Sequence, residues 1–205
     1  HDRFSKLLNT NIDWVSVLMN AMFRIFGSIN GGYLIIDETT INKSFAKIIE
    51  GCSWIWSSRD SGYVFGYHIT LLLWSNGELT IPLAIRVYRK AIEKKDQVTS
   101  IDLAVELLEY AKNVLQIKPD WVLMDGFYSA DKILKRLHEW EWKYVMRVKK
   151  NRVLDGKQIS TLHRNPYWEQ VGILSCKLRV RIIRHGKRYF VTNDLESEKK
   201  LILER

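Results

Sequence analysis

The segment YLIID at residues 33–37 decides the fold. Its apolar residues follow one another without a polar break, which predicts a strand covered on both faces, and an aspartate ends the run. The segment WVLMD at residues 121–125 has the same form. In α/β proteins, ligands bind beside the carboxyl ends of such strands. Asp37 and Asp125 are therefore candidate functional residues.

The residues between these two segments predict a hairpin and a helix. Residues 63–74 and 79–88 have the length and composition of strands, and the Asn-Gly pair between them suits a tight antiparallel turn. Pro82 cannot donate to a sheet ladder, so the second of these strands belongs at the edge of the sheet. Thr99 and Asp102 resemble a capping box, which predicts the start of a helix of about 15 residues.

A second helix and one more strand follow Asp125. Gly126 allows a turn, Ser129 can cap the helix that begins there, and residues 143–148 predict another buried strand. The predicted order from Tyr33 onwards is β-β-β-α-β-α-β. This order predicts an α/β fold with a mixed sheet and helices on its faces.

The remaining segments complete the predicted domain organisation. Residues 13–26 predict a mostly buried helix that ends at Gly27. Because the chain begins with His1 and its last residues resemble the first turns of a helix, we expect a fragment cut at both ends. The predicted segments are the end of an N-terminal helical region (1–32), a partial catalytic core (33–150), a basic β-rich insertion (151–195) and the start of a truncated helix (196–205).

The composition places the chain among globular proteins. It has 205 residues, 46% of them hydrophobic and 27% charged, which excludes wholesale disorder. The longest mainly apolar stretch, residues 14–29, contains Asn20 and Arg24 and is shorter than the roughly 20 apolar residues of a spanning helix, so we expect no membrane segment. Cys52 and Cys176 are too few for a disulfide framework and are not arranged as metal ligands, which predicts a reducing, cytoplasmic setting.

The positive charge is concentrated in one part of the chain. Residues 141–190 hold 13 Lys and Arg against 3 Asp and Glu, whereas the whole chain has a net charge of +9. Such a concentration favours a polyanionic partner such as nucleic acid, although a solvated basic face has the same composition. The candidate phosphate contacts are Lys149, Lys150 and Arg152, which follow the last core strand, and Lys177, Arg179 and Arg181, which alternate along a predicted strand and give a hairpin one cationic face.

The two aspartates predict a metal site if their strands are parallel neighbours. Adjacent strands lie about 4.8 Å apart, so the carboxylates of Asp37 and Asp125 would share ligands. Two ionised carboxylates that close repel each other, and a divalent cation relieves the repulsion. Mg²⁺ prefers oxygen ligands, and two such ions about 4 Å apart support in-line displacement at phosphorus. Each aspartate could instead be a helix cap or a turn former.

Several segments resemble the DDE transposases of bacterial insertion sequences, in the group whose third acid lies in a Tyr-Arg-Glu-Lys signature. The resemblance depends on the order and spacing of short motifs: IDETT at 36–40 with Lys43 after it, GYHI at 66–69, DGFYS at 125–129, YVMRVKKN at 144–151 and TNDL at 192–195. It covers most of residues 33–203. The order of the predicted elements is likewise similar to the ribonuclease H-like fold.

This resemblance implies roles for the acids. Asp37 and Asp125 match the first two metal-binding acids of the family. The third acid, a Glu on a helix after the basic β-rich insertion, has no counterpart before Arg205. The nearest downstream acids stand too early for the motif and read as solvated helix residues: Glu196, Glu198 and Glu204. The resemblance therefore describes a chain truncated before the third acid.

The implied activity is that of a transposase catalytic core. The whole enzyme would use two Mg²⁺ ions, or Mn²⁺ in their place, to cleave DNA and to join the freed 3′ hydroxyl to target DNA. It would act as a homodimer on double-stranded transposon ends, in a bacterial cytoplasm and associated with the nucleoid. Without a third acid, we expect the isolated chain to be inactive. Two alternatives stay open: a non-catalytic DNA-binding or inhibitory remnant, and a ribonuclease H-like nuclease unrelated to transposition.

Five other side chains are candidates for a functional role. Trp168 could stack on a displaced base, but core packing is the stronger interpretation. Trp54 and Trp56 indicate packing on the first hairpin. His68 is interpreted as structural, since no second His or Cys stands at metal-ligand spacing. Glu38 is a candidate for supporting the metal ligands without touching the metal.

Overall fold

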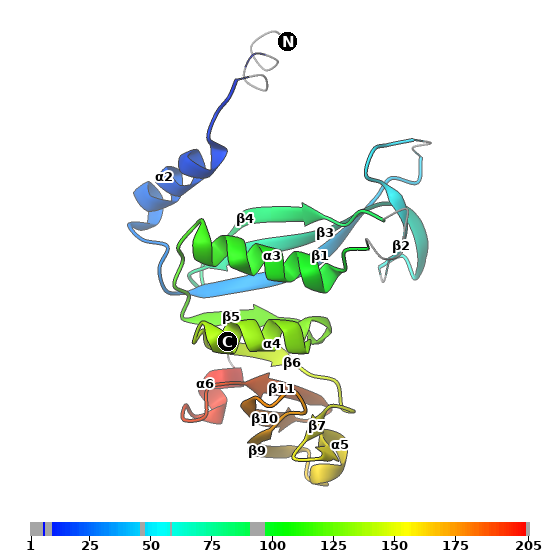
Figure 1. The fold of residues 1–205 in the computed structure, drawn as a ribbon, viewed down its shortest axis with the longest axis vertical. Coiled ribbons are helices and arrows are strands. Elements are labelled where there is room, and N and C mark those ends of the chain that lie inside the picture. Colours follow the sequence, from blue (N-terminus) through cyan, green and yellow to red (C-terminus); the bar gives the residue numbers. More distant parts are fainter. Residues whose placement is uncertain (1–5, 7–9, 46–47, 58, 91–96, 204–205) are drawn as a thin grey trace.

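The fold is built on one large sheet, to which nine strands contribute. The computed structural model describes residue 6 and residues 10–45, 48–57, 59–90 and 97–203. In their order across the sheet, the strands are β2 (Ser53–Ser57), β3 (Gly62–Ser75), β1 (Tyr33–Asn42), β5 (Trp121–Met124), β6 (Tyr144–Arg147), β11 (Arg188–Thr192), β10 (Arg179–His185) and β9 (Tyr167–Ile173), with β4 (Thr80–Val87) paired to β3 (Figure 1).

The centre of the sheet is parallel and its flanks are antiparallel. Strand β5 pairs in parallel with β1 on one side and with β6 on the other. The long strand β3 runs antiparallel to β1, and β4 runs antiparallel to β3 at the sheet edge, as Pro82 predicts. The predicted mixed α/β sheet is therefore confirmed.

Two strands differ from the prediction. Strand β1 does not end at Asp37 but continues to Asn42, because β3 supplies a pairing partner as far as Gly66. Strand β2 was not predicted, so the order from Tyr33 has four strands before the first helix. The rings of Trp54 and Trp56 on β2 contact Phe65 and Tyr63 of β3, with centroids 5.9 and 5.4 Å apart, as expected for packing on the hairpin.

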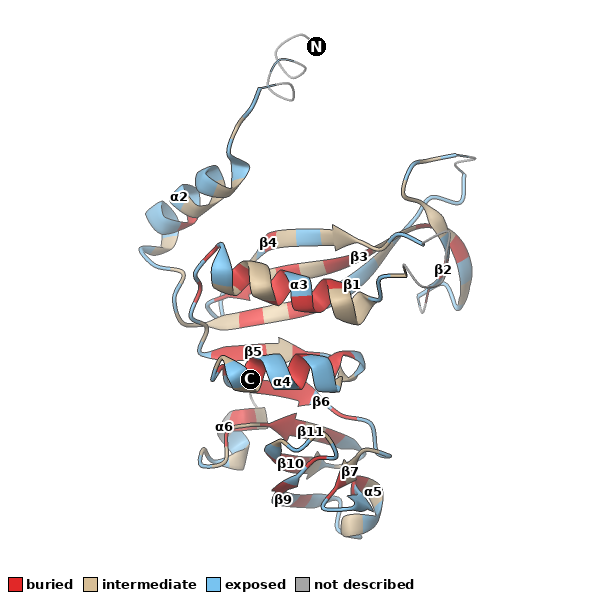
Figure 2. Ribbon diagram, in the orientation of Figure 1, coloured by how far each residue is buried: buried red, intermediate tan, exposed pale blue. Residues whose placement is uncertain are grey.

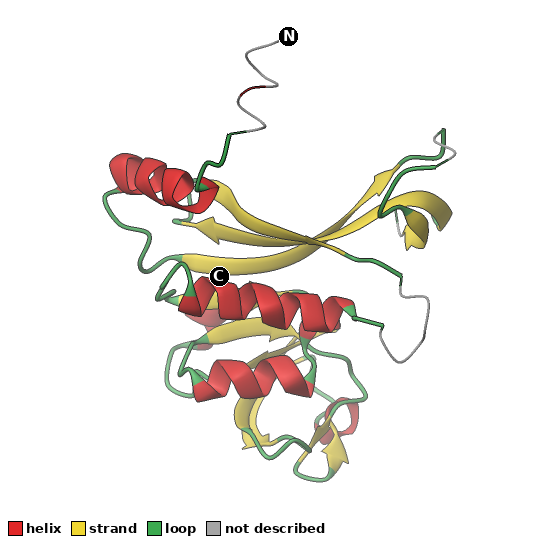
Figure 3. Cartoon of the chain, turned by 45° about the horizontal axis from the view of Figure 1, so that its top comes forward, coloured by secondary structure: helices red, strands yellow, loops and turns green. Residues whose placement is uncertain are grey.

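Helices α3 (Ser100–Asn113) and α4 (Asp131–Glu139) lie side by side on one face of the sheet (Figure 3). The predicted capping box is present, since Thr99 and Asp102 each accept a backbone N–H of the other. The predicted cap of α4 is wrong. The Ser129 hydroxyl donates instead to the carbonyl of Gly126 and closes a short 3-10 turn, η2 (Gly126–Tyr128), so that Ala130 precedes α4 without a side-chain cap.

The basic segment extends the core sheet. Strands β11, β10 and β9 follow β6 in one continuous antiparallel series. A short hairpin of β7 (Val153–Leu154) and β8 (Lys157–Gln158), followed by α5 (Ile159–Leu162), stands beside them. Trp168 on β9 is 7% exposed and belongs to the core, as expected. The domain boundaries themselves remain a prediction.

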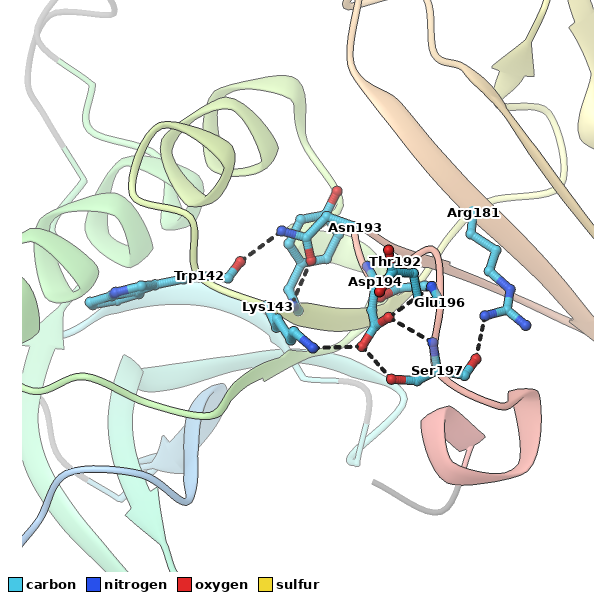
Figure 4. Close-up of polar contacts among 9 residues, drawn as sticks. Trp142, Lys143, Arg181, Thr192, Asn193, Asp194, Glu196 and Ser197 are labelled. Atoms are coloured by element: carbon cyan, nitrogen blue, oxygen red, sulfur yellow. Dashed lines mark hydrogen bonds and ion pairs between the residues drawn. The ribbon is translucent and has the colours of Figure 1, made fainter.

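The connection from β11 to α6 (Lys199–Leu203) is fixed by a buried carboxylate (Figure 4). The side chain of Asp194, only 3% exposed, accepts from the backbone N–H groups of Glu196 and Ser197, from the Ser197 hydroxyl and, over 3.0 Å, from Nζ of Lys143. Burial alone would raise the pKa of Asp194, but the bonds from Ser197 and Lys143 hold it well below its ordinary value.

Neighbouring side chains attach the same connection to β6. Asn193 donates to the carbonyl of Trp142 and accepts from the N–H of Tyr144, over 2.9 and 3.0 Å (Figure 4). The loop therefore directs α6 to the face of the sheet opposite α3 and α4. There Ile202 packs in a small cluster with Trp121 and Ile183.

Helix α2 (Trp14–Phe26) corrects a prediction about burial. It begins at its cap Asp13 and ends at Gly27, as expected, but Met22 is its only buried residue. Phe23 and Ile25 are 66% and 70% exposed, because apolar residues surround this helix while only one side of it contacts the core (Figure 2). None of the helices in the described residues is long and apolar enough to cross a bilayer.

Candidate metal and DNA site

The two candidate acids lie at one edge of the sheet. Ile36 pairs with Met124 in the parallel ladder of β1 and β5, so Asp37 and Asp125 occupy the next, adjacent positions. Both line one cavity of about 260 Å³. The predicted placement of Asp37 and Asp125 at one edge of neighbouring parallel strands is therefore confirmed, whereas their role as metal ligands remains a prediction.

An apolar floor lies beneath the two carboxylates. Alternation along the strands places the acids on the face that α6 covers, and residues of α6 complete the wall of the cavity. The apolar lining includes Ile35, Leu123, Val145, Phe190, Ile202 and Leu203. Solvent therefore reaches the carboxylates mainly from the open edge of the sheet.

Both carboxylates retain free capacity to bind a ligand. Asp125 is 62% exposed, and its Oδ1 lies 3.6 Å from Nη1 of Arg147. Asp37 is exposed as well, and its Oδ1 accepts the backbone N–H of Glu38 over 2.9 Å. Arg147 is not among the predicted site residues, although its place as the last residue of β6, which is parallel to β5, marks the same sheet edge.

The donor set fits a hard divalent cation in part. Two exposed carboxylates on adjacent strands supply the oxygen ligands that Mg²⁺ takes from a protein when waters and phosphate complete its shell. Within the described ranges, no group of three His, Cys, Asp or Glu side chains gathers at a common point. Glu196 and Glu198 are not among the residues that line the cavity, and Glu204 lies outside the described residues.

Glu38 lies on the opposite face from Asp37. Its Oε2 accepts from the Tyr128 hydroxyl over 3.2 Å and lies 3.3 Å from Nε2 of His68. The bond from His68 lowers the pKa of Glu38 against the opposing effect of burial. Burial and the charge of Glu38 raise the pKa of Tyr128, whose side chain is almost fully enclosed. His68, which also contacts Ser100, is thus part of a polar network behind the site.

Of the predicted phosphate contacts that follow β6, two are exposed lysines and the third is an arginine that already forms an ion pair. Lys149 and Lys150 follow β6 at the edge that carries the aspartates, and both are exposed. Arg152 is only 21% exposed and forms an ion pair with Asp131 at the start of α4. Its guanidinium is therefore already partly neutralised.

The prediction of a cationic hairpin face is wrong. Lys177 lies in a turn with a φ of 69° rather than in a strand, and only Arg179 and Lys177 are exposed. Arg181 is 8% exposed, donates to Oε2 of Glu169 over 2.6 Å and bonds the carbonyl of Ser197. The loop before α6 covers this part of the strand, and a diagonal carboxylate on β9 neutralises the charge.

Comparisons with known proteins agree with this geometry. The family described as "Transposase DDE domain" matches residues 31–203. The fold is similar to that of a piggyBac transposase in a synaptic complex with hairpin DNA, with a TM-score of 0.57 and 14% identity over 85% of this chain. This likeness confirms the predicted ribonuclease H-like fold, and the chain spans 37% of that transposase.

Other comparisons add little. The NurA nuclease from Sulfolobus solfataricus is 11% identical over 100% of this chain and 84% of the nuclease, with a TM-score of 0.39 that is too low to support an argument. No curated protein matches the chain.

Proposed function

The chain belongs to the transposase DDE domain family, and from this premise we propose that it forms the core of an enzyme that cleaves and joins DNA phosphodiester bonds with divalent metal ions. The observation that carries the proposal is the meeting of Asp37 and Asp125 in one cavity at adjacent parallel strand ends. Origin in a bacterial insertion sequence, with the Tyr-Arg-Glu-Lys signature beyond these residues, is part of the same proposal.

Asp37 and Asp125 would hold the metal. The chemistry that Mg²⁺ supplies in such sites is activation of an attacking oxygen and stabilisation of a leaving oxygen. The chain's own contribution would be to hold the two carboxylates on adjacent strands, and to limit water on their apolar side through Leu123 and Val145. Arg147, beside Asp125, adds positive charge at the point where a phosphate would enter.

Double-stranded DNA is the proposed substrate. Four exposed cations can contact its phosphates without giving up an existing buried partner: Lys149, Lys150, Lys177 and Arg179. Pairing of two transposon ends requires two catalytic cores, so we propose a homodimer in the whole protein. A bacterial nucleoid is the corresponding location.

The isolated chain is proposed to bind DNA without cleaving it. Only two acids meet in the cavity, and a third ligand for the metal is not found among the described residues. The same observation favours the second candidate function, a DNA-binding remnant that competes with the whole enzyme. Strand cleavage by this chain that Asp37→Ala abolishes would contradict the inactive state.

Titration with Mn²⁺, followed by loss of the electron paramagnetic resonance signal of the free ion, tests the metal site. We expect Asp37→Asn and Asp125→Asn each to weaken binding by roughly tenfold or more, because each removes an anionic ligand. Glu78→Gln is the matched control, since Glu78 is exposed in the turn between β3 and β4 and does not line the cavity that holds Asp37 and Asp125. Equal Mn²⁺ affinities for all four proteins would show that the carboxylates do not form a metal site.

A further inference from the structure

A second cavity, of about 410 Å³, lies at the same edge of the sheet as the acid cavity. One side of it is formed by four residues that closely follow Asp125: Gly126, Phe127, Ser129 and Ala130. The other side is formed by four residues after β6, namely Lys149, Asn151, Arg152 and Val153, and Ser175 closes it from the turn after β9. The cavity therefore adjoins the chain segment that carries the second acid, and its volume lies within the range of about 300–1,000 Å³ typical of small-ligand sites.

The side chains of this second cavity offer donors and positive charge. Lys149 is exposed and forms no ion pair with any described residue. The side chains of Asn151 and Ser175 are exposed as well, and they form no hydrogen bond with the described residues. Arg152 also lines the cavity, and its guanidinium, although paired with Asp131, adds positive charge to the wall.

The start of helix α4 and an aromatic ring also belong to the cavity wall. Ala130 is the N-cap residue of α4 and provides no side-chain cap, so the positive end of that helix lies at the cavity wall that Ala130 forms. Asp131 follows it, but its carboxylate is paired with Arg152. Phe127, 50% exposed, presents a flat apolar ring in the same lining, and its edge contacts Tyr128 with centroids 5.2 Å apart.

We infer that this cavity binds one nucleotide of the DNA strand beside the phosphate at Asp37 and Asp125. Its phosphate contacts Lys149, Asn151 and the uncapped start of α4, and its sugar or base lies against Phe127. The inference rests on the proposed function, because it takes the aspartates as the site of phosphodiester chemistry. The inference predicts that Lys149, which lines the cavity, contributes more to DNA binding than Lys150, which does not line it.

The two adjacent lysines provide a matched test. Affinity of the 205-residue chain for a short fluorescent duplex with a single-stranded overhang is measured by anisotropy at fixed salt. We expect Lys149→Ala to weaken binding about tenfold and Lys150→Ala only about twofold, although both remove one exposed charge. Lys149→Arg should restore most of the affinity, and Phe127→Ala should weaken binding of the overhang duplex more than that of a blunt duplex.

Three results would overturn the inference. Equal losses for Lys149→Ala and Lys150→Ala would show that the cavity does not select a nucleotide. Binding of inorganic phosphate, measured by calorimetry, that depends on Lys149 while DNA affinity does not, would assign the cavity to a free anion. Unchanged affinity of Phe127→Ala for the overhang duplex would show that Phe127 does not contact the sugar or base. Mn²⁺ binding by the aspartates does not depend on any of these three results. Failure of the nucleotide-binding inference therefore leaves the proposed metal site intact.

Discussion

The hydroxyl of Tyr128 donates to Oε2 of Glu38 over 3.2 Å, on the face of the sheet opposite the two aspartates. Glu38 follows Asp37 in β1, and Tyr128 ends the short turn that begins after Asp125. The bond therefore joins the segment that carries the first acid to the segment that carries the second. It is a second link between the two acid-bearing segments, in addition to the parallel ladder of β1 and β5.

Tyr128→Phe removes this bond and keeps the aromatic ring in the core. We expect affinity for Mn²⁺ to fall roughly tenfold, the level at which partners behind metal ligands commonly act. The free energy of unfolding should fall by about 1 kcal/mol. Tyr63→Phe is the control, because Tyr63 is 69% exposed and lines neither cavity. An unchanged Mn²⁺ affinity in Tyr128→Phe would show that the aspartates keep their spacing without it.

Asp194→Ala should destabilise the connection to α6. The substitution leaves Lys143 and the N–H groups of Glu196 and Ser197 without their acceptor, so we expect the free energy of unfolding to fall by about 3 kcal/mol in urea denaturation. Glu196→Ala keeps its backbone N–H and serves as the control, with a change below about 0.5 kcal/mol. Similar stabilities for both variants would contradict the anchoring role of the carboxylate.

Acid should weaken the fold through Asp102. The hydrogen bond from Lys132, and then those from Thr99, lower the pKa of Asp102 from 3.8 to about 2. Because its folded-state pKa lies below the unfolded value, ionised Asp102 stabilises the fold above about pH 4, and this contribution disappears as the pH falls towards about 2. Urea unfolding of the wild type and Asp102→Asn should therefore show a stability difference that shrinks across this window. A constant difference would contradict the assignment.

Because Arg181 is buried, we expect Arg179 but not Arg181 to contact DNA. Arg179→Ala should reduce the magnitude of the slope of log affinity against log salt by about one, whereas Arg181→Met should leave the slope unchanged, because Arg181 is buried against Glu169. Anisotropy titrations at several salt concentrations measure both slopes, and circular dichroism checks that each variant is folded. Equal reductions in the two variants would place Arg181 on DNA.

The sequence could predict elements whose signals are local. The apolar runs before Asp37 and Asp125 indicate buried strands wherever they are placed, and parallel neighbours bring their ends together. The capping box at Thr99 likewise depends only on residues within one turn. These local features are enough to predict that Asp37 and Asp125 lie at the same edge of the sheet, but not the cavity that α6 completes beside them.

The remaining features depend on partners from distant parts of the chain. The length of β1 beyond Asp37 is set by β3, and the burial of Arg181 is set by Glu169 and the loop before α6. The alternation of charged and apolar residues along a strand does not show which face another segment covers. The sequence therefore predicts an exposed Arg181 where the structure buries it. Phe127 and Tyr128 are neighbours in one sequence motif, but packing leaves the first half exposed and encloses the second.

The unequal lengths of β1 and β5 give the two acids different freedom to move. Asp37 lies in mid-strand, held in register with Leu71, while Asp125 stands at the first position outside its strand. A strand interior resists displacement, whereas a residue at the head of a short turn can shift by small backbone rotations. If the two aspartates share a cation as proposed, we expect Asp125 to make most of any change in their separation, and Asp37 to stay nearly fixed.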